Sequence, residues 1–264
     1  MKQINIIPIP NFPIIEPGND LAAIIIDSLK DSPLSIEDRD ILVVAQKIVS
    51  KAEGRIIALK EVIPSERALL LSEKTKKDPK LVELILQDSN EMLAAREDGL
   101  LVVEQKSGFI CANAGIDRSN VGPQNSTEQW VTLLPADADS SAASIRDRIY
   151  ALIKKKVAII INDTHGRPFR EGAVGVAIGV AGIEPIDDKR GCQDLFGYRM
   201  QTTSIAIVDE ISSAASMAMG QAAEGTPVVL IRGVSYQPSD SSAKKLIRAK
   251  EKDFFRHHTY NMGH

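Results

Sequence analysis

Cysteine is scarce in this sequence, with only Cys111 and Cys192 among 264 residues. The two show no paired spacing of the zinc-site type, and reduced thiols are typical of cytoplasmic proteins. The N-terminus lacks a charged region followed by an apolar core and a cleavage site, and no window approaches 18 uninterrupted apolar residues. We therefore expect a cytoplasmic protein that is neither secreted nor membrane-spanning.

The sequence also lacks a strong excess of one charge, since its formal net charge is -3. Lysine and arginine are spread along the chain apart from residues 74–77 and 154–156, which we interpret as solvated helix ends. Neither feature predicts binding to nucleic acid or to an anionic membrane. Internal repeats and low-complexity tracts are missing as well.

The remaining composition is that of an ordinary globular protein, with 44% hydrophobic and 25% charged residues. The length suffices for a substantial core, either as one large domain or as two small intertwined ones. Glycines 175, 179 and 182 do not form a dinucleotide-binding fingerprint, so we predict a tightly packed strand with turns there.

A first candidate site follows the apolar residues 109–111. Gly115 permits a turn, and Asp117, Arg118, Ser119 and Asn120 come directly after it. A carboxylate, a guanidinium, a hydroxyl and an amide in four residues are able to hold a metal ion and a phosphate together. The alternative is a solvated turn with an Asx-type hydrogen bond.

A second candidate site follows residues 156–162, an almost unbroken aliphatic run that predicts a strand covered on both faces. Asp163 and Thr164 come next, and they offer a side-by-side oxygen pair for Mg or Mn. Arg167 and Arg170 are placed to neutralise phosphate charge, and His165 lies between the two groups. Two strands that end in this way suggest one shared metal and phosphate site.

A third group is polar and lies at helical intervals after the expected strand 40–45: Gln46, Lys47, Ser50 and Lys51. Lys47 and Lys51 either bind a polyphosphate or face solvent.

Further strands are expected at residues 4–9, 130–134 and 228–231, with a hairpin turning at Asp98-Gly99. Helices are expected at residues 21–29, 65–89 with a break at Asp78-Pro79, 140–156 and 203–223. We predict Asn19 or Asp20, Ser65 and Asp78 as N-caps and Gly225 as the C-cap of the last helix. Gln221 is a polar side chain near the end of that helix and is placed to reach a ligand. Residues 187–194 form a charged loop that either completes a site or faces water.

Four ordered motifs resemble the coenzyme F420-0:L-glutamate ligase family over nearly the whole chain. They are Gln46-Lys47-Ile48-Val49-Ser50-Lys51-Ala52-Glu53-Gly54, Cys111-Ala112-Asn113-Ala114-Gly115-Ile116-Asp117-Arg118-Ser119-Asn120, Asp163-Thr164-His165-Gly166-Arg167-Pro168 and Arg190-Gly191-Cys192-Gln193-Asp194. The resemblance implies a family-specific α+β fold with mixed, largely antiparallel sheets and two intertwined subdomains. It also implies one catalytic unit over residues 1–264, which is too short to include the C-terminal nitroreductase-like domain of some relatives.

The same resemblance implies a homodimeric, GTP-dependent ligase that adds one or more L-glutamates to the lactyl-phosphate arm of the deazaflavin coenzyme F420-0. The implied ions are Mn²⁺ or Mg²⁺ at two sites, and K⁺. Carried over by position, the metal ligands are Asp117, Asp163, Thr164 and Gln221. The GTP contacts are Phe12, Pro13, Ile14, Ile15, Gln46, Lys47, Lys51, Asn120, Met219, Gly220, Gln221, Ala222, Ala223, Glu224, Gly225 and Thr226.

The expected reaction transfers the GTP γ-phosphoryl group to the lactyl carboxylate, and the glutamate amine then attacks the acyl phosphate. No Gly-x-x-x-x-Gly-Lys-[Ser/Thr] loop is present, so metals and scattered basic residues would hold the phosphates. Arg118, Arg167, Arg170 and Arg190 are candidate charge stabilisers, and no general base is assigned. A metal-dependent nucleotide phosphohydrolase and a non-catalytic nucleotide-binding regulator remain alternatives.

Overall fold

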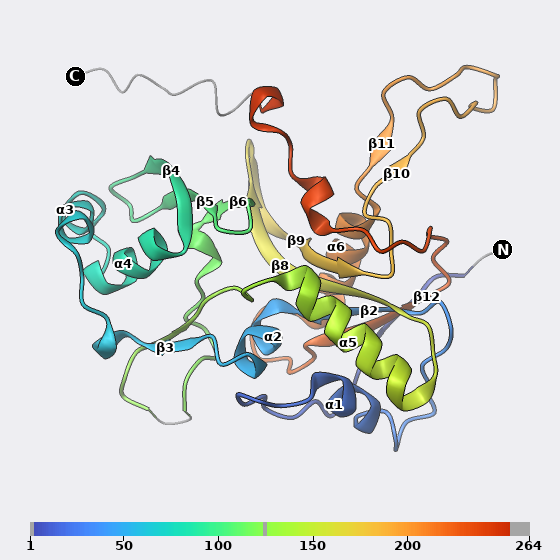
Figure 1. Ribbon diagram of the computed structural model, residues 1–264, viewed down its shortest axis with the longest axis horizontal. Coiled ribbons are helices and arrows are strands. Elements are labelled where there is room, and N and C mark those ends of the chain that lie inside the picture. The colour runs from blue at the N-terminus through green and yellow to red at the C-terminus, as the bar shows by residue number, and fades with distance from the viewer. Residues whose placement is uncertain (1–2, 124–125, 254–264) are drawn as a thin grey trace.

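The fold is α+β, as expected, and Figure 1 shows it as a computed structural model described for residues 3–123 and 126–253. Helices pack against several sheets in which most strand pairs are antiparallel. In the described part of the chain, no helix has the length and apolar character needed to span a bilayer.

A five-stranded mixed sheet forms the main body, in the order β1-β12-β2-β8-β9. Only β2 and β8 run parallel, and the other neighbours are antiparallel. The bounds are β1 (Asn5–Pro8), β2 (Ile41–Ala45), β8 (Ala158–Arg167), β9 (Arg170–Ala181) and β12 (Val228–Arg232).

Helices cover both faces of this sheet, which explains the unbroken aliphatic runs in its central strands. On one face Leu42 and Ile159 pack with α1 (Leu21–Asp27) and α5 (Ala138–Ile153). On the other face Val43 and Ile160 pack with α6 (Ile207–Met219). The prediction of a strand buried on both faces is confirmed.

Glycines allow the helices to approach the sheet closely. A Cβ atom on Gly179 would lie 2.4 Å from the backbone of Ala138 in α5, and one on Gly175 would lie 2.7 Å from Ser212 O in α6. The predicted tight packing of this strand is therefore confirmed.

A second lobe with its own apolar cluster lies on the left in Figure 1. It contains α3 (Glu66–Thr75), α4 (Pro79–Gln87), β3 (Ile56–Ala58), β4 (Ser89–Ala95), β5 (Leu101–Gln105), β6 (Ile110–Ala112) and β7 (Trp130–Thr132). Short 3-10 helices occupy Leu59–Glu61 and Asn113–Gly115 here, and Ala243–Leu246 and Lys250–Lys252 near the end of the described chain. Asp20, Ser65 and Asp78 each cap a helix N-terminus, as predicted.

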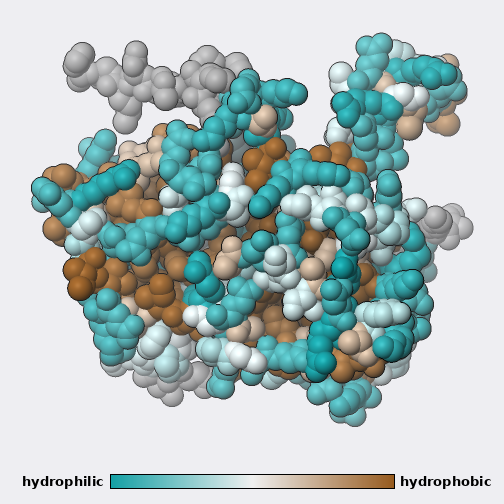
Figure 2. Space-filling model, in the orientation of Figure 1, coloured by the Kyte–Doolittle hydropathy of each residue, from teal (hydrophilic) through white to brown (hydrophobic). Residues whose placement is uncertain are grey.

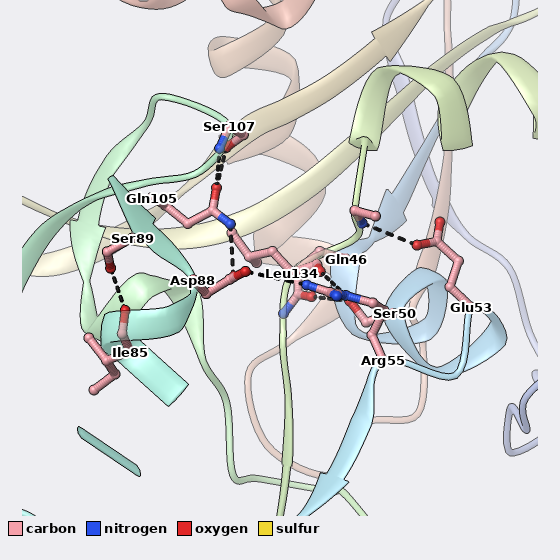
Figure 3. Close-up of polar contacts among 11 residues, drawn as sticks. Gln46, Ser50, Glu53, Arg55, Ile85, Asp88, Ser89, Gln105, Ser107 and Leu134 are labelled. Carbon is pink, nitrogen blue, oxygen red and sulfur yellow. Dashed lines mark hydrogen bonds and ion pairs between the residues drawn. The ribbon is translucent and has the colours of Figure 1, made fainter. Parts of the chain in front are cut away.

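A buried polar chain joins the two lobes (Figure 3). Arg55, which follows α2 (Gln46–Ala52), donates from Nε to Leu134 O at 2.9 Å, and its NH2 lies 3.5 Å from Asp88. Asp88 ends α4 and also accepts from Gln105 Nε2 at 2.9 Å. These contacts tie α2 to the second lobe and satisfy groups that would otherwise be buried alone.

The bounds of two predicted elements differ from the structure in ways that bear on the cavity. β8 does not stop at residue 162 but continues to Arg167, because Asp163–Gly166 keep pairing with β9 after the apolar run ends. The last helix begins at Ile207 rather than at 203, because Ser204 and Ile205 form β11 with β10 (Asp187–Asp188). It ends at Met219, and Gly220 rather than Gly225 is its C-cap.

Candidate active site

A cavity of about 780 Å³ opens at one edge of the central sheet, within the size range of small-molecule sites. Its wall combines residues 12–14, α2, residues 115–117 and 119–123, residues 162–166 and residues 219–227. Both lobes contribute, because residues 115–123 follow β6 of the second lobe.

Strand register brings these segments together. Parallel β2 and β8 are aligned so that Ala45 pairs with Asn162, and Gln46 and Asp163 follow directly at the same edge. β12 runs the other way and begins there, since Ala45 N donates to Pro227 O at 2.8 Å. β1 ends there too, with Pro8 opposite Val229, and it delivers residues 12–14 to the cavity.

Asp117 is the most strongly held carboxylate of the cavity. Lys47 Nζ lies 2.7 Å from its Oδ2, and Ser119 donates to Oδ1 from its backbone N at 2.8 Å and from Oγ at 3.0 Å. Burial favours the neutral acid, but the hydrogen bonds from Lys47 and Ser119 and the charge of Lys47 outweigh it and lower the pKa of Asp117. The carboxylate is therefore ionised at neutral pH. The Asx-type turn named as the alternative is present, and the contact between Lys47 and Asp117 was not predicted from the sequence.

Lys51 lies one helical turn beyond Lys47 and also lines the cavity. Burial and the neighbouring charge of Lys47 lower the pKa of the Lys51 ammonium. In the part of the chain that the structure describes, Lys51 has no carboxylate partner, whereas Lys47 is paired with Asp117. An anion that entered the cavity would relieve the repulsion between these two lysines.

Asp163 and Thr164 lie in a strand, so they are not the side-by-side oxygen pair that the sequence suggested. Alternate side chains of a strand point to opposite faces. Asp163 and His165 are on the less exposed face, where His165 Nε2 lies 3.0 Å from Asp163 Oδ2. Thr164 is on the other face and donates to Gln221 Oε1 at 3.2 Å. The two residues therefore contribute to different sides of the cavity.

The segment after α6 closes one side of the cavity. Gly220 has a φ of 72°, and Glu224 folds back so closely that a Cβ atom at Gly220 would meet it at 2.2 Å. Glu224 accepts from Ala222 N at 2.8 Å, and Thr226 Oγ1 donates to Met219 O at 2.8 Å. Asn120 Nδ2 donates to Ala222 O at 3.0 Å and joins this segment to the loop of Asp117.

Cys111 also lines the cavity, but its environment excludes thiolate chemistry. Burial, with the charges of Asp163 and Asp88, raises the pKa of the Cys111 thiol to about 12. The thiol is therefore protonated at neutral pH and is a poor nucleophile.

Most residues singled out from the sequence line this one cavity. Of the expected nucleotide and metal contacts, only Ile15 does not, because it is 4% exposed and belongs to the apolar core. The four arginines also lie outside the cavity wall. Arg118 contacts Gln129, Arg167 contacts Glu171 O, Arg170 is exposed, and Arg190 pairs with Asp188. Their role in charge stabilisation stays a prediction.

The oxygen donors of the cavity suit a hard divalent cation. Within residues 3–123 and 126–253, no group of three or more His, Cys, Asp or Glu side chains is close enough to form a complete metal cage. Two carboxylates with neutral oxygens instead match the way Mg²⁺ is bound in nucleotide enzymes, where substrate phosphates and water supply the other ligands.

Residues 10–233 match the sequence model of one protein family, F420-0:Gamma-glutamyl ligase. The chain belongs to this family. The resemblance read from its four motifs is thus confirmed, whereas the roles of single residues remain predictions.

Curated relatives of this family are similar along most of their length. A coenzyme F420:L-glutamate ligase from Methanothermobacter thermautotrophicus is 47% identical over 96% of this chain and 99% of its own. Proteins of the same name from Methanocaldococcus jannaschii and Methanopyrus kandleri are 45% and 41% identical. They cover 84% and 97% of this chain and 86% and 99% of their own.

Residue reasoning without the family resemblance missed residues 12–14 and Asn162. The prolines around residue 12 indicate only an extended loop, and nothing local shows that β1 ends beside β12. Asn162 was included in an aliphatic run, yet it is 4% exposed and lines the cavity.

Proposed function

We propose that this protein is a GTP-dependent ligase that joins L-glutamate to the lactyl-phosphate arm of coenzyme F420-0. The observation that carries the proposal is the meeting of two lysines and two carboxylates in one cavity of a chain from the F420-0:gamma-glutamyl ligase family. A polyphosphate and its divalent cations need both kinds of charge.

The reaction needs an activated carboxyl group, because a carboxylate is a poor electrophile at neutral pH. An oxygen of the lactyl carboxylate attacks the γ-phosphorus of GTP, and GDP leaves with the electrons of the broken P–O bond. The glutamate amine then attacks the acyl carbon, phosphate leaves, and the amine loses a proton. Further glutamates would be added through γ-linkages by the same two steps.

Asp117 with Asp163, and Thr164 with Gln221, are the residues that would hold the divalent cations. Mn²⁺ or Mg²⁺ bound there would offset charge on the β- and γ-phosphates. The contact between Lys47 and Asp117 Oδ2 occupies one of the proposed ligand atoms. We propose that Lys47 turns from Asp117 to the phosphates when nucleotide and metal bind. K⁺ belongs to the proposal too, but no described residue is assigned to it.

In the absence of a phosphate-binding loop, Lys47 and Lys51 would hold the nucleotide phosphates. The segment 219–226 and residues 12–14 form other parts of the same wall and would contact the remainder of the nucleotide.

We further propose a single catalytic unit that works as a homodimer. Both lobes line the cavity, which supports one unit. The chain between β10 and β11 forms an arm that extends from the body and carries hydrophobic residues near its tip (Figures 1 and 2). Leu195 and Phe196 are 98% and 96% exposed, which supports burial against a second copy. We also propose a cytoplasmic location, which is supported by two cysteines that are free thiols.

The test is to measure phosphate release from GTP with Mn²⁺ while the deazaflavin acceptor and L-glutamate are left out in turn. A ligase requires the acceptor for phosphate release and both substrates for the amide product. Equal phosphate release without the acceptor would identify a phosphohydrolase instead. Nucleotide binding without any turnover would identify a regulator.

A further inference from the structure

The two carboxylates of the cavity are supported in different ways. Asp117 is held by three hydrogen bonds, from Lys47 and from the backbone and side chain of Ser119. For the Asp163 carboxylate, the only hydrogen bond within the described residues is with His165, whose Nε2 lies 3.0 Å from Oδ2. The orientation of the Asp163 carboxylate therefore depends on one side chain.

The backbone that carries this contact is paired with a neighbouring strand. Asp163 and His165 are two residues apart in β8 and share a face, and they pair with Val176 and Val174 of β9. Their side chains are only 13% and 14% exposed. With the backbone paired to β9 and both side chains largely buried, the remaining freedom of Asp163 is rotation about its side-chain bonds, and the imidazole restrains that rotation.

The direction of the hydrogen bond follows from the chemistry of its partners. A carboxylate oxygen accepts hydrogen bonds, so the imidazole tautomer that fits this contact is the one with N–H at Nε2, which donates to Oδ2. This contact occupies Oδ2 and leaves Oδ1 of Asp163 for another partner. A carboxylate that binds a cation through one oxygen while a neighbour fixes the other is a common arrangement around protein-bound metals.

We propose that His165 is a positioning residue, which orients Asp163 so that Oδ1 binds a divalent cation. The inference rests on the proposed function, because that function places a cation at Asp163. In this role His165 acts through Asp163 and is not itself a ligand of the cation. Loss of such a supporting contact typically weakens metal binding 10- to 100-fold.

The experiment measures Mn²⁺ binding without nucleotide, from the electron paramagnetic resonance signal of free Mn²⁺. The variants are His165→Ala, which removes the donor, and His165→Gln, whose amide nitrogen is able to replace Nε2. Asp163→Asn removes the proposed ligand charge. Glu171→Ala is the matched control, because Glu171 is exposed on the same β-hairpin. Circular dichroism melting shows whether each variant is folded.

We expect His165→Ala to weaken Mn²⁺ binding about 10- to 100-fold. His165→Gln should stay within about threefold of the unaltered protein, which is less than ~0.7 kcal/mol. In turnover assays, excess Mn²⁺ should restore kcat of His165→Ala, since the group that binds the cation is still present. Glu171→Ala should match the unaltered protein.

Three outcomes would overturn the inference. Unchanged Mn²⁺ binding in His165→Ala would show that the imidazole does not orient Asp163. Equal losses in His165→Ala and His165→Gln would show that the imidazole itself is a ligand, and a kcat that excess Mn²⁺ does not restore would assign His165 to the chemical step. If Asp163 binds no cation at all, the result differs from these three outcomes. Asp163→Asn would then bind Mn²⁺ as well as the unaltered protein does.

Discussion

At the scale of single residues, Lys51 is notable because it lines the cavity without a carboxylate partner among the described residues. If it contacts the GTP phosphates, the charge-assisted contact contributes roughly 1.5 to 3 kcal/mol. Lys51→Ala should then weaken GTP binding by about one to two powers of ten. Calorimetric titration of GTP with Mn²⁺ present measures the change.

Lys30→Ala is the matched control for this prediction, because Lys30 is an exposed lysine paired with Asp27 at 2.7 Å and lies outside the cavity. It should leave the dissociation constant unchanged. A shift of less than about threefold for Lys51→Ala would remove Lys51 from the phosphate site.

The second prediction at the residue scale concerns Asp117. Asp117→Asn retains an oxygen that can accept from Ser119 but removes the charge that pairs with Lys47 and that a cation would need. We expect loss of turnover with the fold preserved, as shown by ligase assays and by an unchanged melting profile. Full activity of the purified variant at ordinary Mn²⁺ concentrations would contradict the assignment of Asp117 as a metal ligand.

At the scale of elements, the second lobe depends on a contact between two helices. Glu83 of α4 is buried and accepts from the backbone N of Ser65 at 2.8 Å and from its hydroxyl. Ser65 is the N-cap of α3, so one carboxylate fixes the start of another helix. The hydrogen bonds from the Ser65 side chain and backbone lower the pKa of Glu83, even though burial opposes them.

This contact makes the stability of the lobe depend on pH. Because the folded-state pKa of Glu83 is lowered, its contribution is fully present above the unfolded value of about 4.5 and is lost as the pH falls through the folded value. We expect Glu83→Gln to lower the free energy of unfolding by about 1 kcal/mol at pH 7, since a neutral acceptor makes weaker hydrogen bonds. The difference from the unaltered protein should shrink below pH 4.5.

Urea unfolding at a series of pH values measures this difference. Glu73→Gln is the control, because Glu73 lies on α3 and is exposed. A constant difference between Glu83→Gln and the unaltered protein across the whole pH series would show that the charge of Glu83 does not matter.

At the scale of the whole molecule, the arm between β10 and β11 exposes apolar side chains that contact with a second copy would bury. Its backbone is ordered by its own hydrogen bonds, including Gly191 N to Met200 O at 2.7 Å and Asp194 N to Tyr198 O at 3.0 Å. Its tip nevertheless exposes Leu195 and Phe196 almost completely. Arg190 lies near the base of the arm and pairs with Asp188, so the charged loop expected from the sequence is part of this arm.

We expect the double change Leu195→Ser and Phe196→Ser to dissociate the proposed homodimer. Burying each side chain contributes about 1.5 to 3 kcal/mol, so the dimer dissociation constant should rise by at least two powers of ten. Sedimentation velocity over a range of concentrations measures the change. Ile63→Ser alters an apolar residue of the second lobe that is 86% exposed, and it should have no effect. An arm variant that sediments like the unaltered protein would place the dimer contact elsewhere.

Many strands, helix starts and turns of this protein were predicted from the sequence alone. They depend on interactions between residues that are close together in the chain. Aliphatic runs predicted strands covered on both faces, and short polar side chains at residues 20, 65 and 78 predicted the starts of helices. Asp98-Gly99 predicted the turn between β4 and β5. Asp117, Asp163 and the lysine pair were singled out for the same reason, since each comes after an apolar run that predicts a strand.

Only the tertiary structure decided which of these segments meet. Strand order and register are set by contacts between residues far apart in sequence, so no local pattern shows that Ala45 pairs with Asn162 or that Pro8 lies opposite Val229. The extension of β8 to Arg167 comes from hydrogen bonds with β9, which do not require apolar side chains. That extension separates Thr164 from Asp163 and places His165 against Asp163, because alternate residues of a strand point to opposite faces.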